Sequence, residues 1–166
     1  MPDLEIKKYP ESVLKSKARK VGKVTDAERN ILKDMAKAMY LNSGVGLAAP
    51  QVGIDRQFVV IDVGNGLVNL INPLIVKKRG CDCMEEGCLS VPGVSVKIKR
   101  AKEISVRSLN ENGDDVSFEA SGLFARAIQH EIDHLNGKLI IDYLNPLKRL
   151  LLAGSRKKRV DNCEKL

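Results

Sequence analysis

Both histidines of this 166-residue chain lie in one pentapeptide, His130-Glu131-Ile132-Asp133-His134. On a helix, residues four apart share one face, so both imidazoles can reach a single metal ion. Glu131 follows the first histidine, where a carboxylate can act on a water molecule at the metal. Because the chain has no other histidine, we expect any metal chemistry to start in this segment.

A catalytic metal usually has three protein ligands and one open position, so a third ligand is needed. Position 140 is Ile, which excludes the longer pattern HExxHxxGxxH. Glu164 is a downstream candidate, and Cys88 is an upstream one, because a thiolate suits zinc or ferrous iron. As alternatives, Cys88 is a small buried hydrophobic residue, or it joins Cys81 and Cys83 in a separate thiolate site.

A glycine-rich segment over residues 44–53 precedes both of these motifs. Its glycines permit a close approach of the backbone to a ligand, and Gln51 supplies an amide donor. An ordinary loop between a helix and a strand is the alternative. A phosphate-binding loop is excluded, because no Gly-Lys-Ser/Thr sequence follows.

The three segments together resemble the motifs of the peptide deformylase family, which are GxGLAAxQ, EGCLS and HExDH. They stand here at residues 44–51, 86–90 and 130–134, with every specified residue present. The spacing of the motifs and the chain length also fit. The resemblance therefore covers nearly the whole chain except its last several residues.

The resemblance implies a role for each motif residue. Cys88, His130 and His134 would bind one divalent metal ion, typically Fe(II) in this family, with Zn(II), Ni(II) or Co(II) as substitutes. Glu131 would be the general acid and base. Gln51 and the Leu89 N–H would stabilise the oxyanion, and Gly46 with its neighbour Gly44 would hold the substrate backbone.

The implied reaction is hydrolysis of the N-formyl group from the first methionine of newly synthesised polypeptides, which releases formate. A metal can lower the pKa of water from about 15.7 to about 7, and Glu131 would move the protons. A methionine side chain needs an apolar pocket, for which Val45, Leu123 and Ala127 are candidate walls, with His130 at the base. Leu123 and Ala127 could equally belong to the helix core. We expect the peptide to add beside a strand edge near Val45 and Gly46.

Arg100 is a further candidate for the substrate site. With Asp133 it could also form a network around Glu86, because ligating histidines commonly donate their other nitrogen to a carboxylate. An exposed arginine at the end of a strand is the alternative.

Local patterns predict the elements that carry these residues. Thr25 and Glu28 form a capping box for a helix that should end near Asn42. Strands are expected over residues 58–61, 67–71 and 94–98, and a hairpin over 104–109 and 116–120. A helix over about 123–136 would carry both histidines, with Gly137 as its C-cap.

The short connections between strands favour an α+β fold over a parallel α/β fold. The resemblance implies antiparallel β-sheets packed around the central helix that carries the HExxH motif. Leucines between positions 147 and 152 predict a C-terminal helix.

The composition is typical of one folded domain. Hydrophobic residues make up 43% of the chain, which is enough for one core, so we expect a single catalytic domain over 1–166 with a basic tail from about residue 147. No membrane span and no signal peptide are expected, and four cysteines without a signal suggest reduced thiols in the cytoplasm. A processed organellar form stays open, as do the roles of Cys81, Cys83 and Cys163. Nothing in the sequence requires more than a monomer.

The formal net charge is +7, and much of the excess lies between residues 148 and 159. A basic tail can bind phosphates, and the implied substrate emerges from ribosomes, so we expect a contact of this tail with ribosomal RNA. A solvated helix end is the alternative.

Two other functions fit parts of the sequence. A metallopeptidase that cleaves internal peptide bonds would share HExxH, but it would release an amine-bearing fragment rather than formate. A basic RNA-binding protein with structural histidines would fit the charge. With 4% aromatic residues, however, the chain offers few platforms on which bases could stack.

Overall fold

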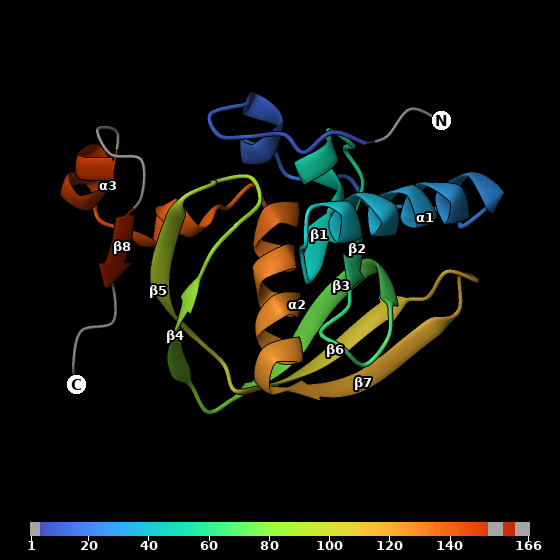
Figure 1. Cartoon of the computed structure of the whole chain (residues 1–166). Coiled ribbons are helices and arrows are strands. Elements are labelled where there is room, and N and C mark those ends of the chain that lie inside the picture. Colours follow the sequence, from blue (N-terminus) through green and yellow to red (C-terminus); the bar gives the residue numbers. More distant parts are fainter. Residues whose placement is uncertain (1–3, 153–157, 162–166) are drawn as a thin grey trace.

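The computed structural model describes residues 4–152 and 158–161 (Figure 1). In chain order the elements are η1 (Ser12–Lys15), α1 (Asp26–Leu41), β1 (Gly46–Ala48), η2 (Ala49–Val52), β2 (Phe58–Ile61), β3 (Val68–Arg79), β4 (Asp82–Glu86), β5 (Val94–Arg100), β6 (Glu103–Leu109), β7 (Asp115–Ser121), α2 (Gly122–Leu135), η3 (Ile140–Tyr143), α3 (Pro146–Leu152) and β8 (Lys158–Asp161). Helix α2 stands at the centre, with one sheet on each side (Figure 1).

The larger sheet has the strand order β1-β2-β3-β6-β7, and all its neighbours are antiparallel. The smaller sheet has the order β4-β5-β8, in which β4 and β5 are antiparallel and β8 runs parallel to β5. The predicted α+β class is therefore confirmed, with the β5–β8 pair as the exception to the antiparallel rule. The predicted C-terminal helix is the short α3.

Helix α1 begins where the capping box predicts. The Ala27 N–H donates to Thr25 Oγ1 at 3.2 Å, and the Thr25 N–H donates to Glu28 Oε2 at 2.9 Å. The helix ends at Leu41, next to the predicted end. The helix packs against β1 and β2. Its last turn is followed closely along the chain by the glycine-rich segment.

Helix α2 buries one side against the larger sheet and carries the two histidines on another side. Ala125, Ile128 and Leu135 are fully or almost fully buried in the cluster that includes residues of β2, β3 and β6. The helix ends at Leu135, and Gly137 follows with φ +72°. This left-handed conformation, which glycine adopts without strain, ends the helix as predicted.

Strand β3 is longer than its sequence predicts. The prediction covers residues 67–71 only. Asn72 does adopt a positive φ of 53°, but the strand continues to Arg79 through two register shifts against β6. The Asn72 amide also bonds both backbone groups of Val21, at 2.8 Å each, so the distortion is held from outside the sheet.

The N-terminal segment lies across all three motif segments. The Lys7 N–H donates to the Gln51 carbonyl at 2.7 Å, and the Tyr9 N–H donates to the Ser90 carbonyl at 2.8 Å. The Ala18 N–H donates to the Leu135 carbonyl at the end of α2, also at 2.8 Å. Backbone hydrogen bonds thus fix the motifs relative to one another.

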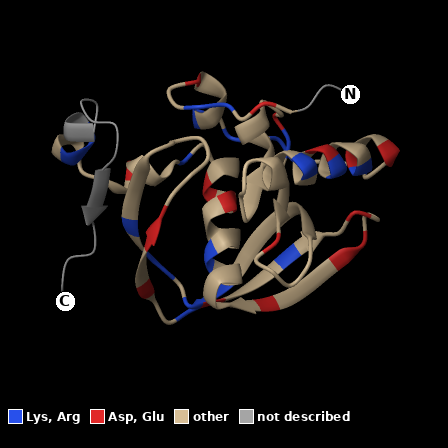
Figure 2. Cartoon of the chain, viewed as in Figure 1, with Lys and Arg blue, Asp and Glu red and all other residues tan. Residues whose placement is uncertain are grey.

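Basic residues gather along the chain where β3 and β5 end and turn into β4 and β6 (Figure 2). The residues at these turns are Lys77, Lys78, Arg79, Lys99, Arg100 and Lys102.

In the described residues, no helix combines the length and the apolar character that a membrane span requires.

We predict that Gly137→Ala destabilises the protein by about 2 kcal/mol or more. A Cβ at this position would lie 2.4 Å from the Lys15 carbonyl oxygen, and the residue would keep an unfavourable positive φ. The free energy of unfolding from urea titrations measures the effect. Gly22→Ala is the control, because its Cβ would meet nothing within 4 Å. Equal effects of the two substitutions would contradict this prediction.

Candidate active site

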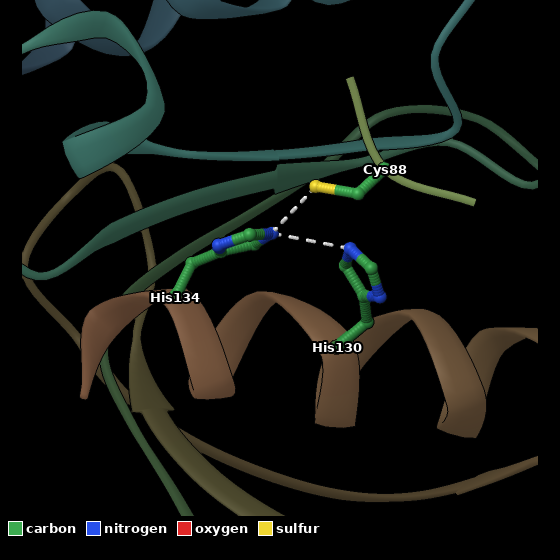
Figure 3. A group of neighbouring side chains, drawn as sticks. All are labelled: Cys88, His130 and His134. Atoms are coloured by element: carbon green, nitrogen blue, oxygen red, sulfur yellow. Dashed lines mark hydrogen bonds between the residues drawn. The ribbon is translucent and has the colours of Figure 1, made fainter. Parts of the chain in front are cut away.

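Cys88, His130 and His134 converge on one point (Figure 3). Both imidazoles project from α2, and Cys88 reaches them from the loop that follows β4. His134 Nε2 lies 3.2 Å from Cys88 Sγ and 3.2 Å from His130 Nε2. The ligating atoms of the three residues all lie within 4.8 Å of one another.

This donor set fits a divalent metal ion. Two nitrogen ligands of a tetrahedral zinc ion lie about 3.3 Å apart, which matches the separation of the two Nε2 atoms. Burial lowers the pKa of His134 well below its usual value, and the charge of His130 lowers it further, so the neutral ligand form is favoured. Burial also lowers the pKa of His130, but hydrogen bonds with Cys88 and Glu86 outweigh this effect and hold the pKa well above its usual value, so a metal ion must displace a proton from this ring. A cysteine sulfur and two imidazole nitrogens suit Zn(II) or Fe(II).

Glu86 fixes the orientation of His130. Its Oε2 lies 3.0 Å from His130 Nδ1, so that Nε2 of the same ring is the atom directed at Cys88 and His134. Burial would raise the pKa of Glu86, but hydrogen bonds from His130 and Arg100 outweigh this effect and hold the pKa at about 2. The carboxylate is therefore charged, and it strengthens the imidazole as a ligand.

Arg100 lies behind the histidines rather than in the substrate pocket. It donates to both oxygens of Glu86, from Nε at 2.6 Å and from Nη2 at 2.8 Å. Its Nη1 donates to Asp133 Oδ2 at 2.9 Å and to the Tyr143 hydroxyl at 3.2 Å. The network expected for Arg100, Asp133 and Glu86 is present. The assignment of Arg100 to the substrate-binding residues is corrected, because its guanidinium is committed to these partners.

Glu131 is buried beside the ligand group. Its Oε2 has no hydrogen-bond partner among the described residues. Burial raises its pKa to about 7, although the charges of His130 and Arg100 oppose the shift. The other oxygen lies close to β1, because a Cβ on Gly46 would be only 2.5 Å from Glu131 Oε1. Any side chain at position 46 would therefore displace the carboxylate.

Gln51 and Leu89 each offer a hydrogen-bond donor, and both residues line the same pocket. Gln51 Oε1 accepts the Ala48 N–H at 2.9 Å, which directs Nε2 toward Cys88 Sγ at 3.6 Å and Ser90 Oγ at 3.3 Å. The Leu89 N–H donates to no other described residue. Both donors come from motif segments, as the resemblance implies.

A pocket of about 420 Å³ adjoins these groups. It contains all the residues expected to contact substrate except Arg100, and Val45 and Leu123 are half exposed at its rim. The lining residues are Ser43, Gly44, Val45, Gly46, Gln51, Met84, Glu85, Glu86, Gly87, Cys88, Leu89, Leu123, Arg126, Ala127, His130 and Glu131.

Met84 and Arg126 line the pocket but are absent from the sequence-based candidates. Arg126 lies one helical turn before His130, a spacing that places both on one face of α2 and could have indicated it. Met84 had no such signal, because β4 itself was not predicted.

The chain matches the model of the polypeptide deformylase family over residues 3–150. It is 50% identical over 144 residues to a peptide deformylase of Halothermothrix orenii, covering 86% of this chain and 94% of that protein. The crystal structure of peptide deformylase from Thermotoga maritima superposes with a TM-score of 0.85 at 44% identity, covering 88% of this chain and 100% of that one. A peptide deformylase from Synechococcus elongatus in complex with actinonin gives a TM-score of 0.86 at 40% identity, covering 92% and 85%.

We predict that Cys88→Ser lowers the affinity for Co(II) by at least about tenfold, because a hydroxyl is a much poorer ligand than a thiolate. The thiolate-to-cobalt charge-transfer absorption should disappear as well. Titration of the metal-free protein with Co(II) measures both effects. Cys81→Ser is the control, because Cys81 is an exposed free thiol outside the ligand group. A charge-transfer band that persists in Cys88→Ser would remove Cys88 from the metal site.

Proposed function

The chain belongs to the polypeptide deformylase family, and we propose that Cys88, His130, His134 and Glu131 perform that family's reaction here. The chain is a hydrolase that removes the N-formyl group from newly synthesised proteins. The observation that supports the residue roles best is the convergence of Cys88, His130 and His134 beside a pocket that Glu131 also lines.

Cys88, His130 and His134 would hold one divalent ion, which we propose to be Fe(II), with Zn(II), Ni(II) or Co(II) as substitutes. When bound, such an ion supplies Lewis acidity that makes water a far stronger acid. Glu86 and Arg100 keep His130 in the ligand orientation, so the chain itself prepares the site for the ion.

Glu131 would move the proton. Its carboxylate takes a proton from the attacking water, whose oxygen forms a bond to the formyl carbon. It then returns the proton to the amine nitrogen as the C–N bond breaks, which yields formate and a free N-terminus. A buried carboxylate with a pKa near neutrality can serve in both directions.

The Gln51 amide and the Leu89 N–H would face the formyl oxygen, where negative charge develops. The Ala48 N–H holds the Gln51 amide in place before substrate arrives. The Leu89 N–H belongs to the backbone and has no described partner to give up. Fixed donors stabilise a transition state without a reorganisation cost.

The methionine side chain would occupy the pocket between β4 and α2, against Ala127, Leu123 and Met84. The peptide backbone would lie along β1, which is an edge strand of the larger sheet. We further propose that the chain acts as a monomeric, single-domain enzyme of the cytoplasm.

We predict that Glu131→Gln retains the metal but lowers kcat for a formylmethionyl tripeptide by about 10²-fold or more, because proton transfer is lost. Formate release and metal content measure the two properties in one preparation. Glu103→Gln, at an exposed site on β6, should behave like the parent protein. Near-normal turnover of metal-loaded Glu131→Gln would exclude this role. An amine-bearing fragment without formate would point to a peptidase.

The basic tail carries the proposed ribosome contact. Arg156 and Lys157 lie outside the described residues, and Lys158 and Arg159 belong to β8. We predict that glutamine at these four positions weakens co-sedimentation with ribosomes at low salt, since each lost phosphate contact reduces affinity. The control carries glutamine at four N-terminal-half positions, Lys17, Lys20, Lys23 and Lys33. Equal sedimentation of both variants and the parent would refute the contact.

A further inference from the structure

The pocket has two walls that belong to different parts of the fold. Met84 and Glu85 come from β4, an edge strand whose only described strand partner is β5. Leu123 and Ala127 come from α2. The distance between β4 and α2 therefore sets the width of the space that receives the substrate side chain.

Arg126 spans this gap. Its side chain is 6% exposed and lines the pocket from α2. Nη2 donates to Asp82 Oδ1 at 2.5 Å and to the Asp82 carbonyl at 3.3 Å, at the start of β4. Nη1 donates to Glu86 Oε1 at 2.6 Å, at the end of β4, and to the Ile98 carbonyl at 3.0 Å on β5. One guanidinium thus holds both ends of β4 against the helix.

Arg100 and Arg126 contact the same carboxylate in different ways. Arg100 binds both oxygens of Glu86, whereas Arg126 binds Oε1 alone. His130 bonds the other oxygen, Oε2. Without Arg126, Glu86 would keep its two-point contact with Arg100 and its bond to His130. The ligand orientation would survive, but the link between β4 and α2 would not.

We propose that Arg126 is a positioning residue that sets the width of the side-chain pocket and thereby determines the selectivity for methionine over bulkier first residues. This inference rests on the proposed function. The bonds of Arg126 hold β4 at a fixed distance from α2, and we infer that this spacing favours a long unbranched side chain between Met84 and Ala127 over an aromatic ring. When β4 is released, its free edge can move outward and admit the ring.

The test compares kcat/KM for formylmethionyl and formylphenylalanyl tripeptides that share their last two residues. Arg126→Met keeps the aliphatic stem and removes every charged bond. The preference for methionine should fall about tenfold, the scale at which pocket fit discriminates between apolar side chains. The change should appear mainly in KM, and the metal content should stay close to that of the parent.

Three further variants separate positioning from general damage. Asp82→Asn removes the negative charge that Arg126 Nη2 contacts, at a side chain that is 39% exposed. This variant should shift the preference in the same direction by a smaller factor. Arg126→Lys should restore part of the preference, because an ammonium can still reach a carboxylate. Arg107→Met, at an exposed position of β6, should change nothing.

An unchanged preference in both Arg126→Met and Asp82→Asn would overturn the proposal. So would a loss of metal with an unchanged preference, because Arg126 would then act on the metal ligands. If Arg126→Met does not fold, Asp82→Asn decides. Absence of formate release by the metal-loaded parent protein would instead refute the proposed function, an outcome distinct from both.

Discussion

The buried carboxylate of Glu86 is the contact on which the site depends. It ends β4, and it accepts hydrogen bonds from Arg100 on β5 and from Arg126 and His130 on α2. Breaking a buried ion pair by removing one partner typically costs about 3–5 kcal/mol, because a charge is left without compensation. The smaller sheet, the central helix and the ligand geometry are therefore coupled through one side chain.

The residues after Glu86 extend this coupling to the chemistry. Cys88 supplies the sulfur of the candidate metal site, Leu89 has a backbone N–H without a described partner, and Ser90 bonds to both Gln51 and the N-terminal segment. The loop between β4 and β5 thus carries a candidate ligand, a donor and two anchors. Its fixed beginning at Glu86 explains how a loop can keep these groups in register without regular hydrogen bonding of its own.

Much of the fold could be predicted because its signals are local. Helices α1 and α2, strand β2 and the β6–β7 hairpin follow from capping residues, periodicity and turn sequences. Strand β1 has only three residues, and one of them is a glycine. Strand β4 has the sequence Asp-Cys-Met-Glu-Glu, in which apolar and polar residues do not alternate. Both are strands because a neighbour pairs with them, which no local pattern records.

The same division holds for the site. The ligands and Glu131 follow from motifs with fixed spacing. The burial of Arg100 and the reach of Arg126 across the pocket depend on where β4 and β5 lie, so they emerge only in three dimensions. The contact of Gly46 with Glu131 likewise joins residues 85 positions apart.

The N-terminal segment gives the site an unusual dependence on chain order. Lys7 and Tyr9 bond to the first and second motif segments, and Ala18 bonds to Leu135, the residue that follows the third. Contacts between distant parts of a chain form late and slowly in folding. A nascent copy of this protein therefore cannot assemble the candidate site until its chain has left the ribosome as far as Leu135, so the first residues must wait for a partner made much later.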